Sequence, residues 1–343
     1  MATAPNAARK AALDSLQAGR GLAAMAVVCH HADTYVSQQV GPLPGALSAA
    51  MAYGYLGVDF FFVLSGFIIY FTNRDRTGRP GWPKDYAESR LTRIFIPYLP
   101  IGIALALVYT YLPQIGHGEQ AWNWFSTLTL LPSGAEPSLH VAWTLQHELV
   151  FYALAFLMLW SGRVLLGALG WAAVLLALLP LRFMLQPGVS PIDLEFLFGI
   201  AVAWCFMEGR VRRHLPLVLG GLACVAAFFA LGGDRYYSPL FGLGLALLLL
   251  PLVRREAEGR LGIPRWLVLL GNASYAIYLI HVPLLSVVVR VCRGFPPLAA
   301  LAVGIAAAAV AGILYHKIYE VPALRLARRL VGYRPARSVV EER

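Results

Sequence analysis

The sequence predicts an all-α integral membrane protein. Of its 343 residues, 59% are hydrophobic and only 13% are charged. Soluble domains carry about 25% charged residues, so this chain lacks the composition of a water-soluble fold. Apolar stretches long enough to cross about 30 Å of hydrocarbon recur along the whole chain. Together these observations predict a bundle of about ten transmembrane helices.

Ten apolar segments are the candidate spans. Each is close to the length that a helix needs to cross a bilayer at about 1.5 Å per residue. The expected ranges are 14–36, 53–72, 91–112, 141–160, 163–180, 189–208, 214–231, 236–253, 265–289 and 296–316. We therefore expect an N-terminal tail over 1–13, a transmembrane domain over 14–320 and a basic C-terminal tail over 321–343.

The distribution of basic residues predicts the orientation, because Lys and Arg are retained on the cytoplasmic side. With the N-terminus inside, Arg182, Arg235, Arg290 and Arg293 fall outside, and the other 24 of the 28 Lys and Arg residues fall inside. This asymmetry predicts cytoplasmic N- and C-termini. It also accounts for the net charge of +10 through membrane orientation and anionic lipid, so no nucleic acid partner is expected.

The N-terminus resembles a signal peptide, since basic residues precede an apolar stretch, but Arg20 interrupts the apolar region and no clean small-residue cleavage site follows. We interpret it as an uncleaved first span. The four cysteines lie in or at the ends of apolar segments without paired spacing. Neither a disulfide framework nor a metal site is predicted.

Polar residues within apolar segments are the main functional signal, because each charged group costs about 2.5–3.5 kcal/mol at the centre of a span. In the first span, Arg20 and His31 are eleven residues apart. Eleven steps of 100° bring both side chains to within about 20° of one face, some 16 Å apart along the axis. Arg20 is therefore expected near the inner surface and His31 in the outer half.

The second span places Asp59 about two turns from its outer end, at a depth that matches His31. A carboxylate that orients an imidazole and raises its basicity is the arrangement used in general-base catalysis. A structural ion pair between two helices is the alternative. Gly57 and Gly66 would permit close helix approach, and Ser65 is a small residue of the kind common at such interfaces.

Two further spans carry titratable groups that we place in the outer half: His147 with Glu148, and His281. With His31 and Asp59, four spans would then contribute to one layer of ionisable side chains. Such a layer suits a reaction chamber. A proton-coupled transporter uses the same kinds of residue and is the main rival interpretation.

The inner ends of the spans carry a second cluster. Arg90 and Arg93 are spaced i,i+3 at the foot of the third span, so they share a side and can bind one anionic group together. Arg20 is at the same level, and Lys317 at the inner end of the last span can add to a phosphate site. Anchoring to headgroups explains any one of these residues singly. A transporter would not need the arginine pair, and a purely structural subunit would need neither cluster.

Six motifs, taken together, resemble those of the acyltransferase 3 family, the multispanning membrane O-acyltransferases that modify exopolysaccharides, O-antigens and related surface glycans. They occur in family order over nearly the whole chain. The motifs are Arg20-x10-His31, "GVDFFFVLSGF" (57–67), "RLTR" (90–93), "WTLQHELVFY" (143–152), "SYAIYLIHVP" (274–283) and "YEVP" (319–322).

The resemblance implies an acyl-CoA donor, usually acetyl-CoA, that approaches from the cytoplasm. It implies an acceptor hydroxyl on an extracytoplasmic polysaccharide or its lipid-linked precursor, although macrolide-modifying relatives use small molecules. It also implies a multi-pass protein of the bacterial inner membrane, with no metal. The domain over 14–320 would be the acyltransferase domain.

The resemblance also implies roles for individual residues. His31 is similar to the catalytic base, and Asp59 and Glu148 to its supporting carboxylates. The donor-binding residues would be Arg20, Arg90 and Arg93, with Lys317 beside them. His281, Ser65 and Tyr275 lie in the same motifs and are expected to support the site. Direct transfer and an acyl-histidine intermediate both remain open, and no group that stabilises the oxyanion is evident.

Overall fold

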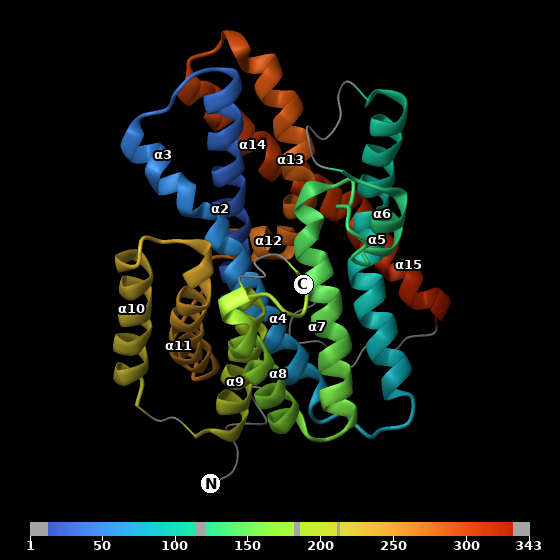
Figure 1. The fold of residues 1–343 in the computed structure, drawn as a ribbon, viewed down its shortest axis with the longest axis vertical. Helices are drawn as coiled ribbons and strands as arrows, with labels where there is room; N and C mark the ends of the chain where they lie inside the picture. Colours follow the sequence, from blue (N-terminus) through green and yellow to red (C-terminus); the bar gives the residue numbers. More distant parts are fainter. Residues whose placement is uncertain (1–12, 114–120, 182–185, 211–212, 332–343) are drawn as a thin grey trace.

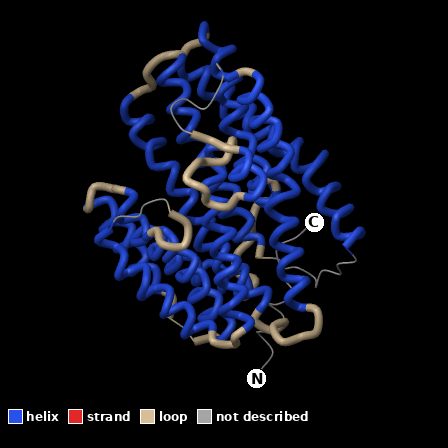
Figure 2. Tube along the Cα trace, turned by 45° about the vertical axis from the view of Figure 1, so that its right-hand side comes forward, coloured by secondary structure: helices blue, strands red, loops and turns tan. Residues whose placement is uncertain are grey.

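The computed structural model describes residues 13–113, 121–181, 186–210 and 213–331. Apart from one isolated bridge between Trp122 and Glu136, these residues form helices, turns and loops without strands (Figure 2). The expected all-α class is therefore confirmed. Most of the two predicted tails, and Arg182, lie outside the described residues.

The helices follow one another with short connections (Figure 1). The α-helices are α2 (Asp14–Gln39), α3 (Gly45–Ala52), α4 (Gly57–Asn73), α5 (Trp82–Tyr111), α6 (Trp124–Thr129), α7 (Trp143–Trp160), α8 (Val164–Leu178), α9 (Leu194–Glu208), α10 (Leu215–Ala230), α11 (Ser238–Ala257), α12 (Arg265–Asn272), α13 (Ser274–Val291), α14 (Pro297–Tyr315) and α15 (Val321–Val331). Short 3₁₀ turns precede α4, α7, α9 and α11, and a π-helix, His316–Glu320, joins α14 to α15.

Helices occupy all ten segments that the sequence marked as spans. Within the described residues, seven helical segments are long and apolar enough to cross a membrane. They are Gly45–Asn73, Trp82–Tyr111, His140–Trp160, Val164–Leu181, Arg235–Ala257, Ser274–Gly294 and Pro297–Leu330. The protein is therefore a multi-pass membrane protein with at least these candidate spans.

Two boundaries differ from the expected ones. The third helix begins at Trp82 rather than near residue 91, because Gly81 takes a left-handed conformation (φ 81°) and Pro83 favours the first turn of a helix. Arg90 and Arg93 therefore lie two to three turns inside α5 instead of at its foot. The last helix continues through the π-helix into α15, whose Leu324 is 5% exposed, so residues 321–331 of the expected tail form a helix.

Glycines allow the central helices to touch along their backbones, as expected for Gly57 and Gly66. A Cβ atom on Gly57 would lie 2.3 Å from the carbonyl oxygen of Ala23 in α2, and one on Gly66 would lie 1.9 Å from that of Phe196 in α9. Both predictions of close approach are confirmed. Gly199 faces α4 in the same way, so small residues on both helices allow close contact of their backbones at this crossing.

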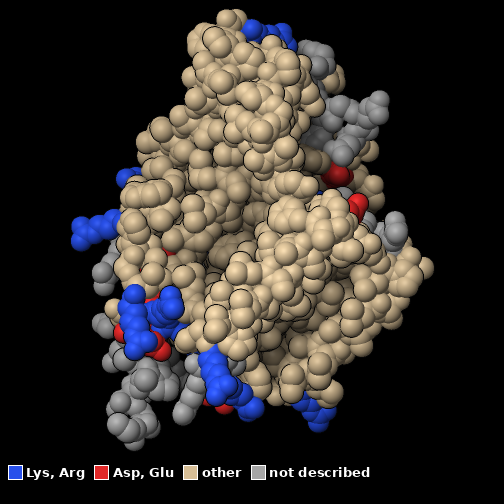
Figure 3. All heavy atoms as spheres, turned by 90° about the vertical axis from the view of Figure 1, so that its left-hand side faces the viewer, with Lys and Arg blue, Asp and Glu red and all other residues tan. Residues whose placement is uncertain are grey.

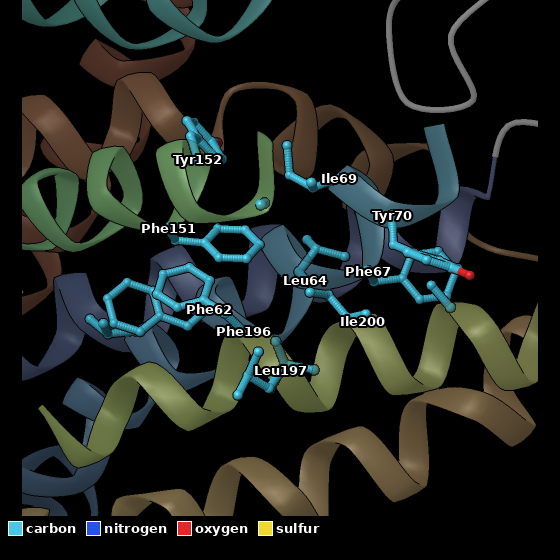
Figure 4. Close-up of a cluster of buried hydrophobic side chains, with 14 of the residues drawn as sticks. Phe62, Leu64, Phe67, Ile69, Tyr70, Phe151, Tyr152, Phe196, Leu197 and Ile200 are labelled. Atoms are coloured by element: carbon cyan, nitrogen blue, oxygen red, sulfur yellow. The ribbon is translucent and has the colours of Figure 1, made fainter. Parts of the chain in front are cut away.

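Aromatic rings fill the space beside this crossing (Figure 4). The Phe196 ring of α9 stacks on Phe62 of α4 at 4.4 Å and on Phe151 of α7 at 4.2 Å between ring centroids. The resulting core joins α4, α7 and α9. Helix α2 packs against α4 and also against α12, α13 and α14. The face drawn in Figure 3 carries Lys and Arg mainly towards its lower end and almost none across its middle.

Candidate active site

A cavity of about 710 Å³ lies within the bundle and is lined by α2, α4, α5, α7, α12, α13 and the segment from the π-helix to α15. Along α4 it extends from Val58 to Thr72, which corresponds to about 21 Å of helix. Seven of the ten residues expected at the site line it, namely Arg20, Ser65, Arg90, Arg93, Glu148, Tyr275 and Lys317. His31, Asp59 and His281 are not among its lining residues.

Arg93 is held by a carboxylate that the sequence reasoning left out of the site. Its Nη1 donates to Oε1 of Glu320 at 2.8 Å, and Nδ1 of His316 lies 2.8 Å from the other oxygen of Glu320. The Glu320 side chain is fully buried, and Arg20 lies within its electrostatic reach. Glu320 therefore acts as a shared counter-ion for the arginines of α2 and α5 and also contacts His316 of the π-helix. In the sequence, the position of Glu320 in the "YEVP" motif (319–322) is the signal that could have identified it as a site residue.

Arg90 has a different environment. Its guanidinium lies over the Tyr152 ring at 5.8 Å from the centroid, and among the described residues no carboxylate pairs with it. The two arginines that the sequence treats as an equivalent pair therefore line one cavity with unequal partners. Arg93 already neutralises Glu320, whereas the Arg90 guanidinium lines the cavity without a carboxylate partner among the described residues.

Glu148 lies in this inner cavity and not in the outer layer where we expected it. Its Oε1 accepts hydrogen bonds from Ser65 Oγ at 2.9 Å and from the Tyr152 hydroxyl. Adjacent helix positions point about 100° apart, so Glu148 faces the cavity while its neighbour His147 faces away. The Ser65 hydroxyl thus has a polar role in addition to its small size.

Tyrosines fix α5 in the position that presents both arginines. The Tyr275 hydroxyl donates to the Ile94 carbonyl at 3.0 Å while its ring lies 5.1 Å from the Arg93 guanidinium. Pro100 lacks the N–H that would bond the Ile96 carbonyl, and the Tyr319 hydroxyl donates to that carbonyl at 3.3 Å. These contacts give Tyr275 a supporting place beside the arginines.

His31 lies on the outer side of the cavity, beside other histidines. Its ring centroid is 5.1 Å from that of His281 and 5.1 Å from that of His30. Nδ1 of His281 donates to the Tyr278 carbonyl at 2.6 Å, which leaves Nε2 of this buried ring as an acceptor with no hydrogen-bond partner among the described residues. His31 and His281 are thus brought together, as their expected placement in one layer implied.

Asp59 does not form the expected pair with His31. Gly57 packs against Ala23, eight residues before His31, so the main chain at Gly57 lies about 12 Å below that at His31, at 1.5 Å per residue, and Asp59 follows further down α4. Its fully buried carboxyl group lies against that of Glu195 and near Ser238, in the field of Arg235. Arg235 in turn lies between the Trp143 and Tyr55 rings, at 4.8 and 5.1 Å.

A buried pair between a carboxylate and an imidazole forms instead between Asp193 and His147. Nδ1 of His147 lies 2.7 Å from Oδ1 of Asp193, and both side chains are almost fully buried. The other oxygen of Asp193 accepts the main-chain N–H groups of Gly188 and Ser190, which fixes its orientation. His147 and Asp193 are 46 positions apart in the sequence, so local sequence patterns could not predict their contact.

Tyr278 separates the cavity from the two histidines. It lines the cavity, and its ring centroid is 5.5 Å from that of His281. Its hydroxyl lies 3.0 Å from Oγ1 of Thr144 and 3.1 Å from the carbonyl oxygen of Val141 on the opposite side. Tyr278 is therefore the lining residue that connects the cavity wall to the two histidines. Among the described residues, no group of three or more His, Cys, Asp or Glu side chains could hold a metal ion.

The chain is similar to a known protein family over most of its length. The family model described as an acyltransferase domain matches residues 13–316, which is most of the chain and contains His31, His281 and the cavity lining from α2 to α13. The chain belongs to the acyltransferase 3 family. The resemblance seen in the six motifs is thereby confirmed, and an acyltransferase is the class of enzyme that the family supports.

Two relatives of this acyltransferase 3 protein are similar over most of their length. One is the exopolysaccharide production protein ExoZ of Rhizobium meliloti (strain 1021), 32% identical over 80% of this chain and 91% of the relative. The other is the acyltransferase MdmB of Streptomyces mycarofaciens, 28% identical over 92% of this chain and 93% of the relative. No solved structure matches the chain.

Proposed function

We propose that this acyltransferase 3 protein transfers an acyl group, acetyl in the first instance, from cytoplasmic acyl-CoA to a hydroxyl of an extracytoplasmic polysaccharide or its lipid-linked precursor. The observation that carries the proposal is the cavity, which has cationic groups at one end and the His31–His281 pair beyond the other. Relatives named for exopolysaccharide production and for acyl transfer support the reaction class and favour a glycan acceptor.

The donor would lie along the cavity. Phosphates suit guanidinium groups, and Arg90, Arg20 and Lys317 line the same cavity as Arg93. From Tyr152, beside Arg90, to Thr144 at the other end is eight residues of α7, or about 12 Å. The extended arm of a CoA thioester can span that distance, and the acyl carbon would then lie near Tyr278 and the histidines.

His31 would carry the chemistry. In the direct route it removes the proton of the acceptor hydroxyl as the hydroxyl oxygen attacks the thioester carbonyl. In the alternative route its ring nitrogen is acylated first and passes the group to the acceptor. Asp59 lies too far below for direct contact, so any support for His31 would be electrostatic, and Glu148 would act on the donor side of the cavity.

The proposal includes ten spans, with both termini on the cytoplasmic side of a bacterial inner membrane. The lower end of the bundle, where the Lys and Arg residues on the face in Figure 3 gather, would face the cytoplasm. The acceptor would then approach His31 from the opposite side. No nucleic acid partner is proposed.

Sided membrane vesicles test this function. Acetyl-CoA labelled in the acetyl group is supplied outside inverted vesicles that contain the glycan acceptor in their lumen. The proposal predicts label in the luminal glycan with the wild-type chain and none with His31→Ala. Label that appears only when acetyl-CoA is loaded into the lumen would contradict the proposed direction. Acceptor export without acylation would favour the transporter interpretation.

A further inference from the structure

We infer that the hydroxyl group of Tyr278 is the hydrogen-bond donor that stabilises the oxyanion formed at the thioester carbonyl. This inference rests on the proposed function and assigns a role that neither the sequence motifs nor the comparisons supply. Acyl transfer requires such a donor, because negative charge develops on the carbonyl oxygen in the transition state. Three features of the structure place it at Tyr278.

The first feature is position. Tyr278 lines the donor cavity and is 6% exposed, and its ring lies next to that of His281, which in turn lies next to His31. Arg90 and Arg93 lie over Tyr152 and Tyr275, closer to the inner end. A thioester that reaches past these two rings therefore meets the Tyr278 hydroxyl immediately before the histidines.

The second feature is the hydrogen-bond arrangement around the hydroxyl. Tyr278 Oη and Thr144 Oγ1 both lie within hydrogen-bond distance of the Val141 carbonyl, at 3.1 and 3.0 Å, and 3.0 Å from each other. Two donors therefore share one carbonyl acceptor. If Tyr278 turns its proton to an oxyanion, Thr144 still satisfies the Val141 carbonyl, and no buried acceptor loses its only partner.

The third feature is the local charge. Arg235 lies within electrostatic reach of Tyr278, as does Glu148 on the donor side. The positive charge of the arginine favours negative charge near this hydroxyl. Arg235 is itself kept in place by stacking between Trp143 and Tyr55. The cationic side chain need not contact the substrate to contribute.

In the proposed step the acyl group moves from the CoA sulfur to the acceptor oxygen. The acceptor oxygen bonds to the carbonyl carbon as its proton moves to His31, and the C=O π electrons move to the carbonyl oxygen, which accepts the Tyr278 hydrogen bond. The oxyanion then collapses, the C=O bond re-forms, the C–S bond breaks, and the CoA thiolate takes the proton from His31. If His31 is acylated first, its ring nitrogen attacks the thioester carbonyl carbon and forms an oxyanion on the same oxygen, which collapses as the C–S bond breaks and the CoA thiolate takes the proton of the other ring nitrogen. The acceptor oxygen then attacks the acyl-histidine carbonyl carbon, the C–N bond breaks, and the acceptor proton returns to His31.

The test compares Tyr278→Phe with Tyr98→Phe. Tyr98 is also fully buried and its hydroxyl donates to the Thr127 carbonyl at 2.8 Å, but it does not line the cavity. Tyr278→Phe should lower kcat for acetyl-CoA by about 10²–10³-fold, the usual effect of removing one oxyanion donor. KM should stay unchanged, and Tyr98→Phe should keep the wild-type kcat.

Ligand binding provides a readout that a structural role would not affect. A CoA analogue with a trifluoromethyl ketone in place of the thioester forms a tetrahedral, oxyanion-like centre, and Tyr278→Phe should weaken its binding by the factor lost in kcat. Acetyl-CoA binding should not change. If the variant folds poorly, 3-fluorotyrosine at position 278 retains the hydroxyl and strengthens it as a donor, so it should change kcat while the same replacement of Tyr98 does not.

Each outcome decides the inference. Equal kcat for Tyr278→Phe and Tyr98→Phe would overturn it, as would equal weakening of the ketone analogue and acetyl-CoA. In both cases a wild-type protein that turns over acetyl-CoA leaves the proposed function standing. A wild-type protein that neither binds nor turns over acetyl-CoA would instead overturn the proposed function, and this inference with it.

Discussion

Replacing Arg90 and Arg93 separately by alanine should produce two different defects. Arg90 has an aromatic neighbour but no carboxylate partner among the described residues, so its removal strands no buried charge. The lost cation–π contact costs about 0.5–1 kcal/mol of stability. The lost hydrogen bond to a charged phosphate is worth about 1.5–3 kcal/mol. At about 1.4 kcal/mol per tenfold change, the Kd for acetyl-CoA should rise by roughly 10- to 150-fold.

Arg93→Ala should instead destabilise the fold. It leaves the fully buried Glu320 carboxylate without a guanidinium that lies 2.8 Å away. Breaking a buried pair in this way costs about 3–5 kcal/mol. We expect the lower end of this range, because His316 stays 2.8 Å from Glu320 and the Arg93 side chain is 25% exposed.

The assay combines thermal unfolding in detergent with acetyl-CoA binding for Arg90→Ala, Arg93→Ala, Glu320→Ala and the double variant Arg93→Ala/Glu320→Ala. The double variant should be more stable than the sum of its single changes implies, since both charges are then removed together; a coupling of about 0.5–3 kcal/mol is expected for a contacting pair. The reasoning is refuted if Arg93→Ala is as stable as Arg90→Ala, or if Arg90→Ala binds acetyl-CoA as tightly as the wild type.

Two further predictions concern the core. Gly66→Ala would bring a Cβ atom to 1.9 Å from the Phe196 carbonyl, and this overpacking should lower the free energy of unfolding by about 1–3 kcal/mol or more. Gly170→Ala is the control, because a Cβ atom there would have no atom within 4 Å and should not destabilise the protein. Thermal unfolding of the two variants measures the difference. Asp193→Asn should lower the melting temperature, because it disrupts the buried pair with His147, but it should leave the Kd for acetyl-CoA unchanged. Weaker acetyl-CoA binding by the folded variant would contradict the separation of this pair from the cavity.

The fold class and the donor side of the site could be predicted from the sequence for physical reasons. Apolar runs of membrane length specify helices whatever their neighbours are, and all ten expected segments are helical. Residues within one or two helical turns keep a fixed relation, so Arg90 and Arg93 do face the same cavity. Gly57 and Gly66 likewise mark close helix contacts, because only a missing side chain permits them.

The contacts between distant helices could not be predicted in the same way. Depth along a span depends on where each helix begins, and the α3 segment before α4 places Asp59 below His31. Rotation about the helix axis then decides partners, which is why His147 meets Asp193 while Glu148 faces the cavity. The ion pair between Arg93 and Glu320 joins residues 227 positions apart, and only the assembled bundle reveals it.

The central claim is that acetyl-CoA bound in the inner cavity reacts at His31. The most direct measurement is the binding and slow hydrolysis of labelled acetyl-CoA by the purified protein, compared for wild type, His31→Ala and Arg90→Ala. The account predicts that His31→Ala binds the donor as tightly as the wild type but does not hydrolyse it, and that Arg90→Ala loses affinity. Wild-type hydrolysis by His31→Ala, or no acetyl-CoA binding by any of the three proteins, would contradict it.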